Sequence, residues 1–280
     1  MKIVLAVDGS KYGRWATQWV TKAPFAKKPR VNAVHVVDLA ALRAPFIVQP
    51  AMIGYEPVIR YQAGQLKKRA RRVEAETKKL LAPLKAKAVV RIEQGPAAPT
   101  ILKHAGRGAL VVLGQRGLGD LDRFFLGSVS TNVTLHAPCS VLVIKHQPRP
   151  IGRIVLAVDG SKASDRAVQF VLRELRPSKR QGIEVTVLHI LPPFAYSQAA
   201  VAGLALAHRY ARKLAAMRYR VKIMPRPGDP AEEIVKAAKS LKADLLVAGA
   251  KGLSAVGRFL LGSVSTKLVR HSPCSILIVR

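Results

Sequence analysis

The sequence predicts an α/β protein built from two similar halves, each with a parallel sheet covered by helices. Short apolar runs alternate with helical segments along the chain, a pattern typical of parallel sheets with right-handed crossovers. Residues 3–10 recur unchanged as residues 154–161, so the chain contains an internal repeat. A length of 280 residues suits about two domains, each large enough to bury its own core.

Each half opens with an apolar strand that ends in an acidic, glycine-containing turn, after which a helix and a second strand follow. We expect these elements at residues 3–7, 11–22 and 31–37 and, in the repeat, at residues 154–158, 162–175 and 183–190. Each second strand carries one histidine, His35 or His189. Because both lie on strands that we expect to be buried, we interpret them as core histidines.

The two halves diverge most in the next segment. Residues 39–57 contain three prolines and cannot form one helix, which predicts a long surface loop, either a binding lid or a variable insertion. The counterpart at residues 192–198 is much shorter. Charged helices follow at residues 58–81 and 196–217. The basic run 67–72 fans around the first of them, which favours a solvated face over a nucleic-acid site.

The helix starts after the next strands differ in strength. These strands are expected at residues 89–93 and 221–224. In the second half Asp229 can cap the helix, Pro230 suits the first helical position, and Glu232 completes a capping box. The matching Pro96 offers no carboxylate, and losing a cap typically costs about 1 kcal/mol. We therefore expect a looser helix start in the first half.

A glycine pattern recurs near the end of each half, after a buried-strand pattern and before a short helix. Its residues are Gly114, Gly117, Gly127 and Ser128 in the first half and Gly249, Gly252, Gly262 and Ser263 in the second. Such a loop can cradle an anion, because glycine permits positive φ and close backbone approach, and a helix N-terminus offers free N–H donors. The hydroxyls of Ser128, Ser130, Ser263 and Ser265 could donate to phosphate or cap the helix. The alternative is that the glycines only form tight turns, but two copies in one context favour the anion site.

The strands around the glycine pattern complete both halves. They are expected at residues 109–113 and 140–145, and at residues 245–248 and 275–280. Ligands of parallel sheets bind beyond the carboxyl ends of the strands, where the Asp8 turn and the Gly114 loop would meet. A proline-containing connection separates the halves, so we expect a first domain at residues 1–146, a linker at 147–152 and a second domain at 153–280.

Composition limits the choice of partners. The net charge is +31, from 47 basic and 16 acidic residues, and such a charge attracts polyanions. Zinc-finger spacing and aromatic RNA-binding motifs are missing from the sequence, which favours a generally basic surface over a nucleic-acid-binding one. No apolar run reaches the roughly 18 residues that a membrane helix needs, and the N-terminus does not resemble a signal peptide, so we expect a cytoplasmic protein. Cys139 and Cys274 share a Pro-Cys-Ser context and are expected to be buried and unlinked.

The glycine pattern, the Val-Asp-Gly-Ser start and the Pro-Cys-Ser ending together resemble tandem universal stress proteins (the UspA family) over essentially the whole chain. The resemblance implies two Rossmann-like domains of the adenine nucleotide alpha hydrolase type, each a five-stranded parallel sheet of order 3-2-1-4-5 with helices on both faces. It also implies ATP between the first turn and the glycine-rich loop, and an internal pseudo-dimer in which the last strands of the halves pair. A homodimer of whole chains stays open.

Carried over residue by residue, the resemblance places Asp8 and Asp159 beside ribose and adenine, and the main chain of Val36 and Ile190 beside adenine. Ribose and phosphates would be held by Gly114, Gly117, Gly127, Ser128, Val129 and Ser130 in one half and by Gly249, Gly252, Gly262, Ser263, Val264 and Ser265 in the other. Two acids common in the family are kept in the second half, as Asp229 and Asp244. The first half has Pro96 and Ala109 there, so we expect the second site to be the stronger.

The charged groups near these loops allow more than one role. Arg123 and Arg258 lie at matching places inside the nine-residue segments and could neutralise phosphate or be ordinary loop arginines. Asp8 and Asp159 could contact Mg²⁺ or cap the following helices. A Walker lysine is absent, so phosphate contacts would be mostly backbone.

The leading hypothesis is therefore an ATP-binding protein with a regulatory or stress-survival role, because no nucleophile–base pair is recognisable. Two alternatives stay open. One is a slow ATPase or nucleotidyl-transfer enzyme, for which the sequence offers no water-positioning group. The other is an interaction protein that binds polyanions through its basic surface and binds no nucleotide.

Overall fold

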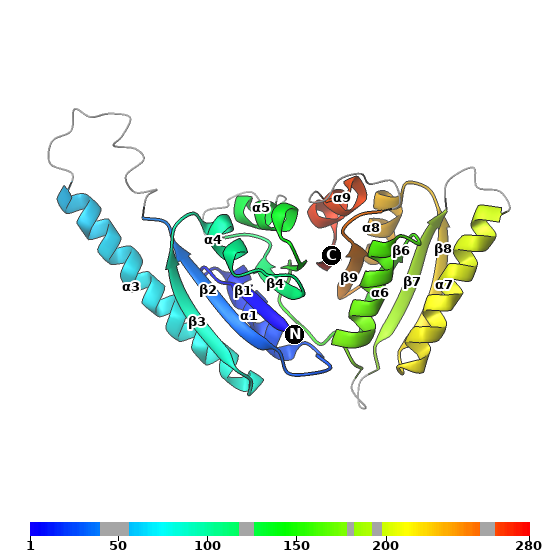
Figure 1. Ribbon diagram of the computed structural model, residues 1–280, viewed down its shortest axis with the longest axis horizontal. Helices are drawn as coiled ribbons and strands as arrows, with labels where there is room; N and C mark the ends of the chain where they lie inside the picture. Colours follow the sequence, from blue (N-terminus) through cyan, green and yellow to red (C-terminus); the bar gives the residue numbers. More distant parts are fainter. Residues whose placement is uncertain (40–55, 118–125, 178–181, 192–197, 253–260) are drawn as a thin grey trace.

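The computed structural model describes residues 1–39, 56–117, 126–177, 182–191, 198–252 and 261–280, in which ten strands form one continuous sheet (Figure 1). The strands of the first half are β1 (Lys2–Ala6), β2 (Arg30–Val37), β3 (Ala88–Gln94), β4 (Ala109–Gly114) and β5 (Ser140–Ile144). Those of the second half are β6 (Arg153–Val158), β7 (Glu184–Leu191), β8 (Arg220–Pro227), β9 (Leu245–Gly249) and β10 (Ser275–Val279).

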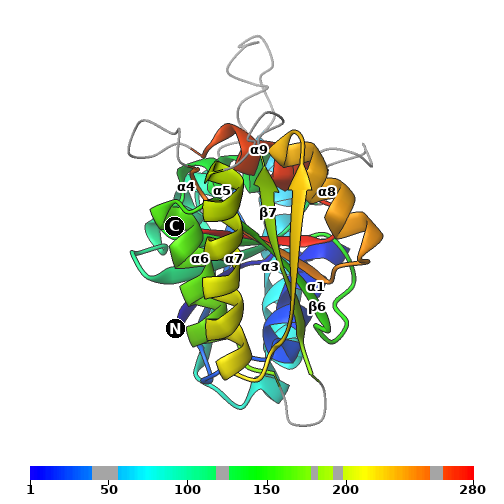
Figure 2. The ribbon, with the colours of Figure 1, turned by 90° about the vertical axis from the view of Figure 1, so that its right-hand side faces the viewer.

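Helices cover both faces of this sheet. In the first half they are α1 (Lys11–Lys22), α3 (Glu56–Leu81), the short 3₁₀ helix η2 (Ala82–Leu84), α4 (Ala97–Lys103) and α5 (Ser128–His136). In the second half they are α6 (Lys162–Glu174), α7 (Gln198–Ala216), α8 (Pro230–Ser240) and α9 (Ser263–His271). Figure 2 shows α6 and α7 on one side of the second half and α8 on the other.

The strand order is β3-β2-β1-β4-β5-β10-β9-β6-β7-β8. Within each half all pairings are parallel, and the order is the 3-2-1-4-5 that the resemblance implies. The halves join where β5 and β10 pair antiparallel, with Leu142 opposite Leu277. The chain therefore forms the expected internal pseudo-dimer, with one sheet running through both halves.

Alternation along the strands explains the two-sided burial. On β1 and β4, Ile3, Leu5, Leu110 and Val112 point into a core shared with α1, α3, α6 and α7. Val4 and Val111 between them point into a second core shared with α4, α5, α8 and α9. Because both faces are covered, the central strands are apolar at nearly every position, as parallel sheets require.

Two basic side chains fasten the halves together beside the central strand pair. Lys145, just after β5, is 5% exposed, and its ammonium donates to the carbonyl oxygens of Arg270 and Ser272, at 3.2 and 2.8 Å. These carbonyls lie at the C-terminal end of α9 in the other half. Arg280, just after β10, makes the reciprocal contact with α5, donating to the carbonyl oxygen of Thr134 at 2.6 Å. Each cation thus binds the negative end of a helix dipole that belongs to the other half.

The elements differ from the sequence expectations mainly at their ends. Helix α3 begins at Glu56, two residues before the expected start, and the expected loop at residues 39–57 lies almost wholly outside the described residues. Asp229 caps α8 by accepting from the Glu232 N–H at 3.0 Å, whereas α4 begins at Pro96 without a side-chain cap and is only seven residues long. The expected difference in capping between the halves is confirmed, and the looser helix start in the first half stays a prediction.

The remaining expectations on burial hold as well. Cys139 and Cys274 are both buried and both unlinked. Among the described residues, no helix combines the length and the apolar character needed to cross a membrane.

Candidate functional site

The turn after the first strand of each half is built by an aspartate, a glycine and a serine. Gly9 has a φ of +78°, and Asp8 Oδ1 accepts the Ser10 N–H at 3.0 Å. The Ser10 hydroxyl in turn accepts the Gly13 N–H at 3.0 Å and caps α1. The aspartate therefore closes the turn and the serine caps the helix, so capping, one of the two roles considered for the aspartate, belongs to the serine.

The second half repeats this turn. Gly160 has a φ of +82°, Asp159 Oδ1 accepts the Ser161 N–H at 2.9 Å, and the Ser161 hydroxyl caps α6 by accepting the Ser164 N–H at 3.1 Å. In both turns the bond to Oδ1 fixes the carboxylate at the carboxyl end of the first strand. The second carboxylate oxygen faces the glycine-rich loop.

The glycines of the recurring pattern are needed for close approach between backbones. A Cβ at Gly114 would lie 2.5 Å from Tyr12 Cβ and 2.8 Å from its carbonyl carbon, so only glycine lets the loop touch α1 there. A Cβ at Gly117 would lie 2.9 Å from Asp8 Oδ2. Of the two properties that glycine offers, close approach and positive φ, the pattern uses the first, since positive φ values occur at other glycines, among them the turn residues Gly9 and Gly160.

The same approach distances recur in the second half. A Cβ at Gly249 would lie 2.7 Å from the carbonyl carbon of Ala163 in α6, and a Cβ at Gly252 would lie 2.9 Å from Asp159 Oδ2. In both halves the turn and the glycine-rich loop are therefore in contact, although the hydrogen bonds that join them span 106 residues in the first half and 90 in the second. This meeting of the two segments is what the topology predicts.

Helix α5 begins directly against this loop, with its first N–H groups uncapped. Gly127 is the N-cap residue and has no side-chain cap, and the exposed Ser128 is the first helical residue. The Ser130 hydroxyl donates to the Gly114 carbonyl oxygen at 2.7 Å. Ser130 thus ties the helix to the loop, a role different from the phosphate contact or cap expected for its hydroxyl.

Helix α9 begins in the same way. Gly262 is its uncapped N-cap residue, and the Ser265 hydroxyl donates to the Gly249 carbonyl oxygen at 2.7 Å. By contrast α1, α6 and α8 all begin with a side-chain cap. Helices α5 and α9 therefore keep N–H donors for another acceptor, and the partial positive charge of a helix N-terminus favours an anionic one.

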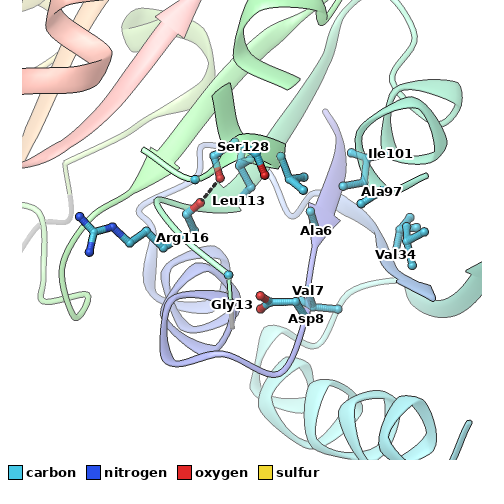
Figure 3. A pocket seen from close by; sticks show the side chains of 16 residues that line it. Ala6, Val7, Asp8, Gly13, Val34, Ala97, Ile101, Leu113, Arg116 and Ser128 are labelled. Atoms are coloured by element: carbon cyan, nitrogen blue, oxygen red, sulfur yellow. Dashed lines mark hydrogen bonds between the residues drawn. The ribbon is translucent and has the colours of Figure 1, made fainter. Parts of the chain in front are cut away.

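In the first half these parts enclose a pocket of about 420 Å³. All eight residues expected from the sequence for this half line it: Asp8, Val36, Gly114, Gly117, Gly127, Ser128, Val129 and Ser130. In Figure 3, Val34, Ala97 and Ile101 form an apolar side, and Ser128 lies on the side of the glycine-rich loop. The pocket therefore combines an apolar wall with a helix N-terminus and one carboxylate.

Sequence reasoning missed several residues that line the pocket. Val34 precedes Val36 by two residues and so points to the same face of β2. Ala97 and Ile101 lie four residues apart on α4 and share one helix face. Both spacings can be read from the sequence, and they could have predicted that these residues line the pocket. Arg116 also lines the pocket, but Figure 3 shows its guanidinium pointing away from Asp8.

The second half places its expected residues in equivalent positions. Ile190 lies on β7 as Val36 lies on β2, and Val264 follows Ser263 in the first turn of α9. Some lining residues of the first pocket have different counterparts in the repeat, such as Ser164 for Gly13 and Lys251 for Arg116. Arg123 and Arg258, the arginines expected near phosphate, lie outside the described residues.

The strand histidines hold the strands beside the pocket. His35 Nδ1 lies 2.8 Å from the Val7 carbonyl oxygen, and His189 Nδ1 lies 2.9 Å from that of Val158. A carbonyl oxygen only accepts, so Nδ1 carries the proton in both rings. His35 is buried and His189 partly buried, which supports their interpretation as structural residues.

A divalent metal would find few protein ligands here. Within the part of the chain that the structure describes, no group of three or more His, Cys, Asp or Glu side chains could hold a metal ion. Each turn offers one carboxylate, Asp8 or Asp159. That set fits Mg²⁺ only as a companion of phosphate oxygens, which is a common mode of Mg²⁺ binding.

The model of the universal stress protein family matches residues 1–145 and 150–280. The chain belongs to the universal stress protein family. Along its whole length it is similar to a universal stress protein of Mycolicibacterium smegmatis, with 27% identity over 299 residues that cover 99% of this chain and 96% of the relative. The two matched segments make it a tandem member of the family.

A solved structure of the family agrees on the fold. A universal stress protein from Archaeoglobus fulgidus superposes with a TM-score of 0.71 at 20% identity, covering 100% of this chain and 98% of that chain. A universal stress protein solved in complex with cAMP matches 46% of this chain and 97% of that chain, at 30% identity and a TM-score of 0.37.

Proposed function

We propose that this tandem universal stress protein binds ATP in the pocket of its first half and in the equivalent site of its second half. The observation that carries the proposal is the convergence of eight expected residues, from the turn after β1, from β2, from the glycine-rich loop and from α5, on one pocket. A volume of about 420 Å³ lies in the usual range for small-molecule sites.

The two sides of the pocket suit the two ends of a nucleotide. Val34, Val36 and Ile101 offer an apolar surface for the flat adenine ring. At the other end the uncapped N–H groups of Ser128, Val129 and Ser130 can donate to phosphate oxygens. Asp8, held in its turn by Ser10, can accept from the ribose hydroxyls between them.

The arrangement supports binding and regulation better than catalysis. The described part of the pocket contains one carboxylate and no histidine, cysteine or lysine. Phosphate would be held by backbone donors, and Mg²⁺, when bound, would neutralise phosphate charge. A bound nucleotide would stabilise the folded chain, so its presence could be read by a partner in a stress response.

The proposal is tested by filling the pocket. Replacing Ala97 by tryptophan places an indole against the apolar wall, and Ala75→Trp makes the same change on an exposed position of α3 as a control. Nucleotide-stripped protein is titrated calorimetrically with ATP and Mg²⁺, and with AMP and cAMP for comparison. We expect two binding events per chain for the natural protein and for Ala75→Trp, and one for Ala97→Trp.

Two outcomes would contradict the proposal. If the natural protein binds no ATP, the pocket is not a nucleotide site. If Ala97→Trp folds and still shows two events of unchanged affinity, ATP binds elsewhere.

A further inference from the structure

A second cavity lies between the two halves, away from the nucleotide pocket. We call it the junction cavity, and its volume is about 430 Å³. The first half contributes the residues before β4 and β5, and the second half contributes one face of α6 and the end of β10. Both chain ends and α6 lie together on this side of the molecule (Figures 1 and 2). The nucleotide pocket lies at the opposite, carboxyl ends of β1 and β4.

The junction cavity is strongly basic. Four arginines line it, Arg107 from the first half and Arg166, Arg173 and Arg280 from the second, together with one acidic side chain, that of Glu174. Within the described residues, the guanidinium groups of Arg107, Arg166 and Arg173 form no ion pair and no hydrogen bond. Four guanidinium groups from the two halves therefore surround the cavity, and few acidic side chains neutralise their positive charge.

Among these cations, the guanidinium of Arg280 is held in place by hydrogen bonds. Its guanidinium donates to the carbonyl oxygens of Thr134, Leu135 and Cys139, at 2.6, 3.3 and 3.3 Å. Burial lowers the pKa of this guanidinium, and the one group that acts against the loss of water is Cys139, not an acidic side chain. An anion in the cavity would supply that missing charge.

The internal repeat provides a built-in comparison. The equivalent cavity on the other side of the junction, about 370 Å³, is occupied along one side by the linker and contains Asp244. That carboxylate accepts from Arg149 Nε at 2.9 Å and from the N–H groups of Gly152 and Arg153 at 2.9 and 2.8 Å. In the junction cavity, Ala109 stands where Asp244 stands in the repeat. The acid that neutralises one cavity is therefore missing from the other.

We propose that the junction cavity is a binding site for a small oligophosphate, held between the two halves. Guanidinium groups form paired, charge-assisted hydrogen bonds with phosphate oxygens, and several of them are needed for a multiply charged ligand. The volume suits a small molecule, and Gln169 and Phe170 add a polar group and an apolar wall for its remainder. The inference is independent of ATP binding in the nucleotide pocket.

The test uses inorganic pyrophosphate as the probe, titrated calorimetrically into the full chain in about 150 mM salt to screen unspecific attraction. The titration is done with and without saturating ATP. The variant Arg107→Ala/Arg173→Ala removes two cations from the cavity. The matched control Arg69→Ala/Arg212→Ala removes two exposed arginines from α3 and α7 and changes the net charge equally. A third variant, Ala109→Asp, copies the acid of the repeat into the cavity.

We expect pyrophosphate to bind the natural chain in the presence of ATP. Its affinity for Arg107→Ala/Arg173→Ala should be lower by at least about tenfold. The control should lose no more than about twofold, as expected for distant, screened charges. Ala109→Asp should weaken binding as well, while ATP affinity stays unchanged in all three variants. Equal losses in the control and the cavity variant would overturn the proposal, as would the absence of ATP-independent pyrophosphate binding.

Discussion

Lys145 should make the stability of this chain rise with pH between about 8 and 10.5. Its ammonium is buried at the junction of the halves, and burial lowers its pKa from 10.5 to about 8, while the nearby Cys274 acts in the opposite direction. The facing groups are that thiol and the carbonyl oxygens of Arg270 and Ser272. Folding lowers the pKa of the Lys145 amine, so between about pH 8 and 10.5 the unfolded chain binds more protons than the folded chain. The stability contribution is full above the unfolded pKa and is lost as pH falls through about 8.

The size of the effect follows from the shift. A difference of about 2.5 pKa units corresponds to about 3 kcal/mol over the whole interval. Between pH 7 and 9 the linkage relation gives about 1.3 kcal/mol, which chemical denaturation can resolve. The Cys274 thiol works in the opposite direction, because burial raises its pKa to about 11. Its contribution is present below the unfolded pKa of about 9 and is lost as pH rises toward 11.

The assay compares the natural chain with Lys145→Arg by urea unfolding at pH 7, 8 and 9. Arginine stays charged throughout this range, and Arg280 already occupies the equivalent place after β10. Cys274 and all surface lysines are common to both chains, so their titration cancels in the difference. We expect the free energy of unfolding of the natural chain, relative to Lys145→Arg, to increase by about 1.3 kcal/mol from pH 7 to 9. A difference that stays constant with pH would refute the reasoning.

Three further predictions concern backbone approach, capping and thiol burial. Gly114→Ala should destabilise the chain by about 1–3 kcal/mol in urea unfolding, because the added Cβ meets Tyr12. The control Gly64→Ala, in open space on α3, should stabilise the chain by about 0.5–1 kcal/mol. Equal effects of the two substitutions would contradict the packing argument. Asp229→Ala should cost about 1 kcal/mol through the lost cap of α8, and no change in the urea midpoint would count against it. Cys139 and Cys274 should react slowly with a thiol reagent at pH 8 until the chain unfolds, because burial raises the pKa of both thiols. A fast reaction of the native chain would show that the two thiols are accessible and would contradict this prediction.

The sequence was sufficient to assemble the pocket because two independent rules agreed. The repeat identified the Asp8 turn and the Gly114 loop as paired features, and parallel-sheet topology placed both at the carboxyl ends of neighbouring strands. The structure brings them into contact, with the Cα of Gly117 against the Asp8 carboxylate. Strand order and the pairing of β5 with β10 followed from the family resemblance rather than from the residues.

The sequence could not show which atoms a glycine or a hydroxyl would meet. Glycine permits both positive φ and close backbone approach, and the constraint at Gly114 is contact with Tyr12, a neighbour set by the packing of α1 on the loop. The Ser130 hydroxyl was expected to face phosphate, and it instead bonds a carbonyl oxygen in the preceding loop. The role of Lys145 depends on helix ends in the other half, and no local pattern reports such a contact.

Hydrogen exchange of the first turn of α5 shows whether the helix N-termini hold the phosphates of ATP. In the free chain the N–H groups of Ser128, Val129 and Ser130 have no side-chain cap, so they should exchange quickly. Bound ATP should slow exchange in this turn and in residues 263–265, and AMP should do so less, because it lacks the outer phosphates. If ATP binds but leaves the exchange of both turns unchanged, the helix N-termini do not hold the phosphates, and the proposed mode of binding is wrong.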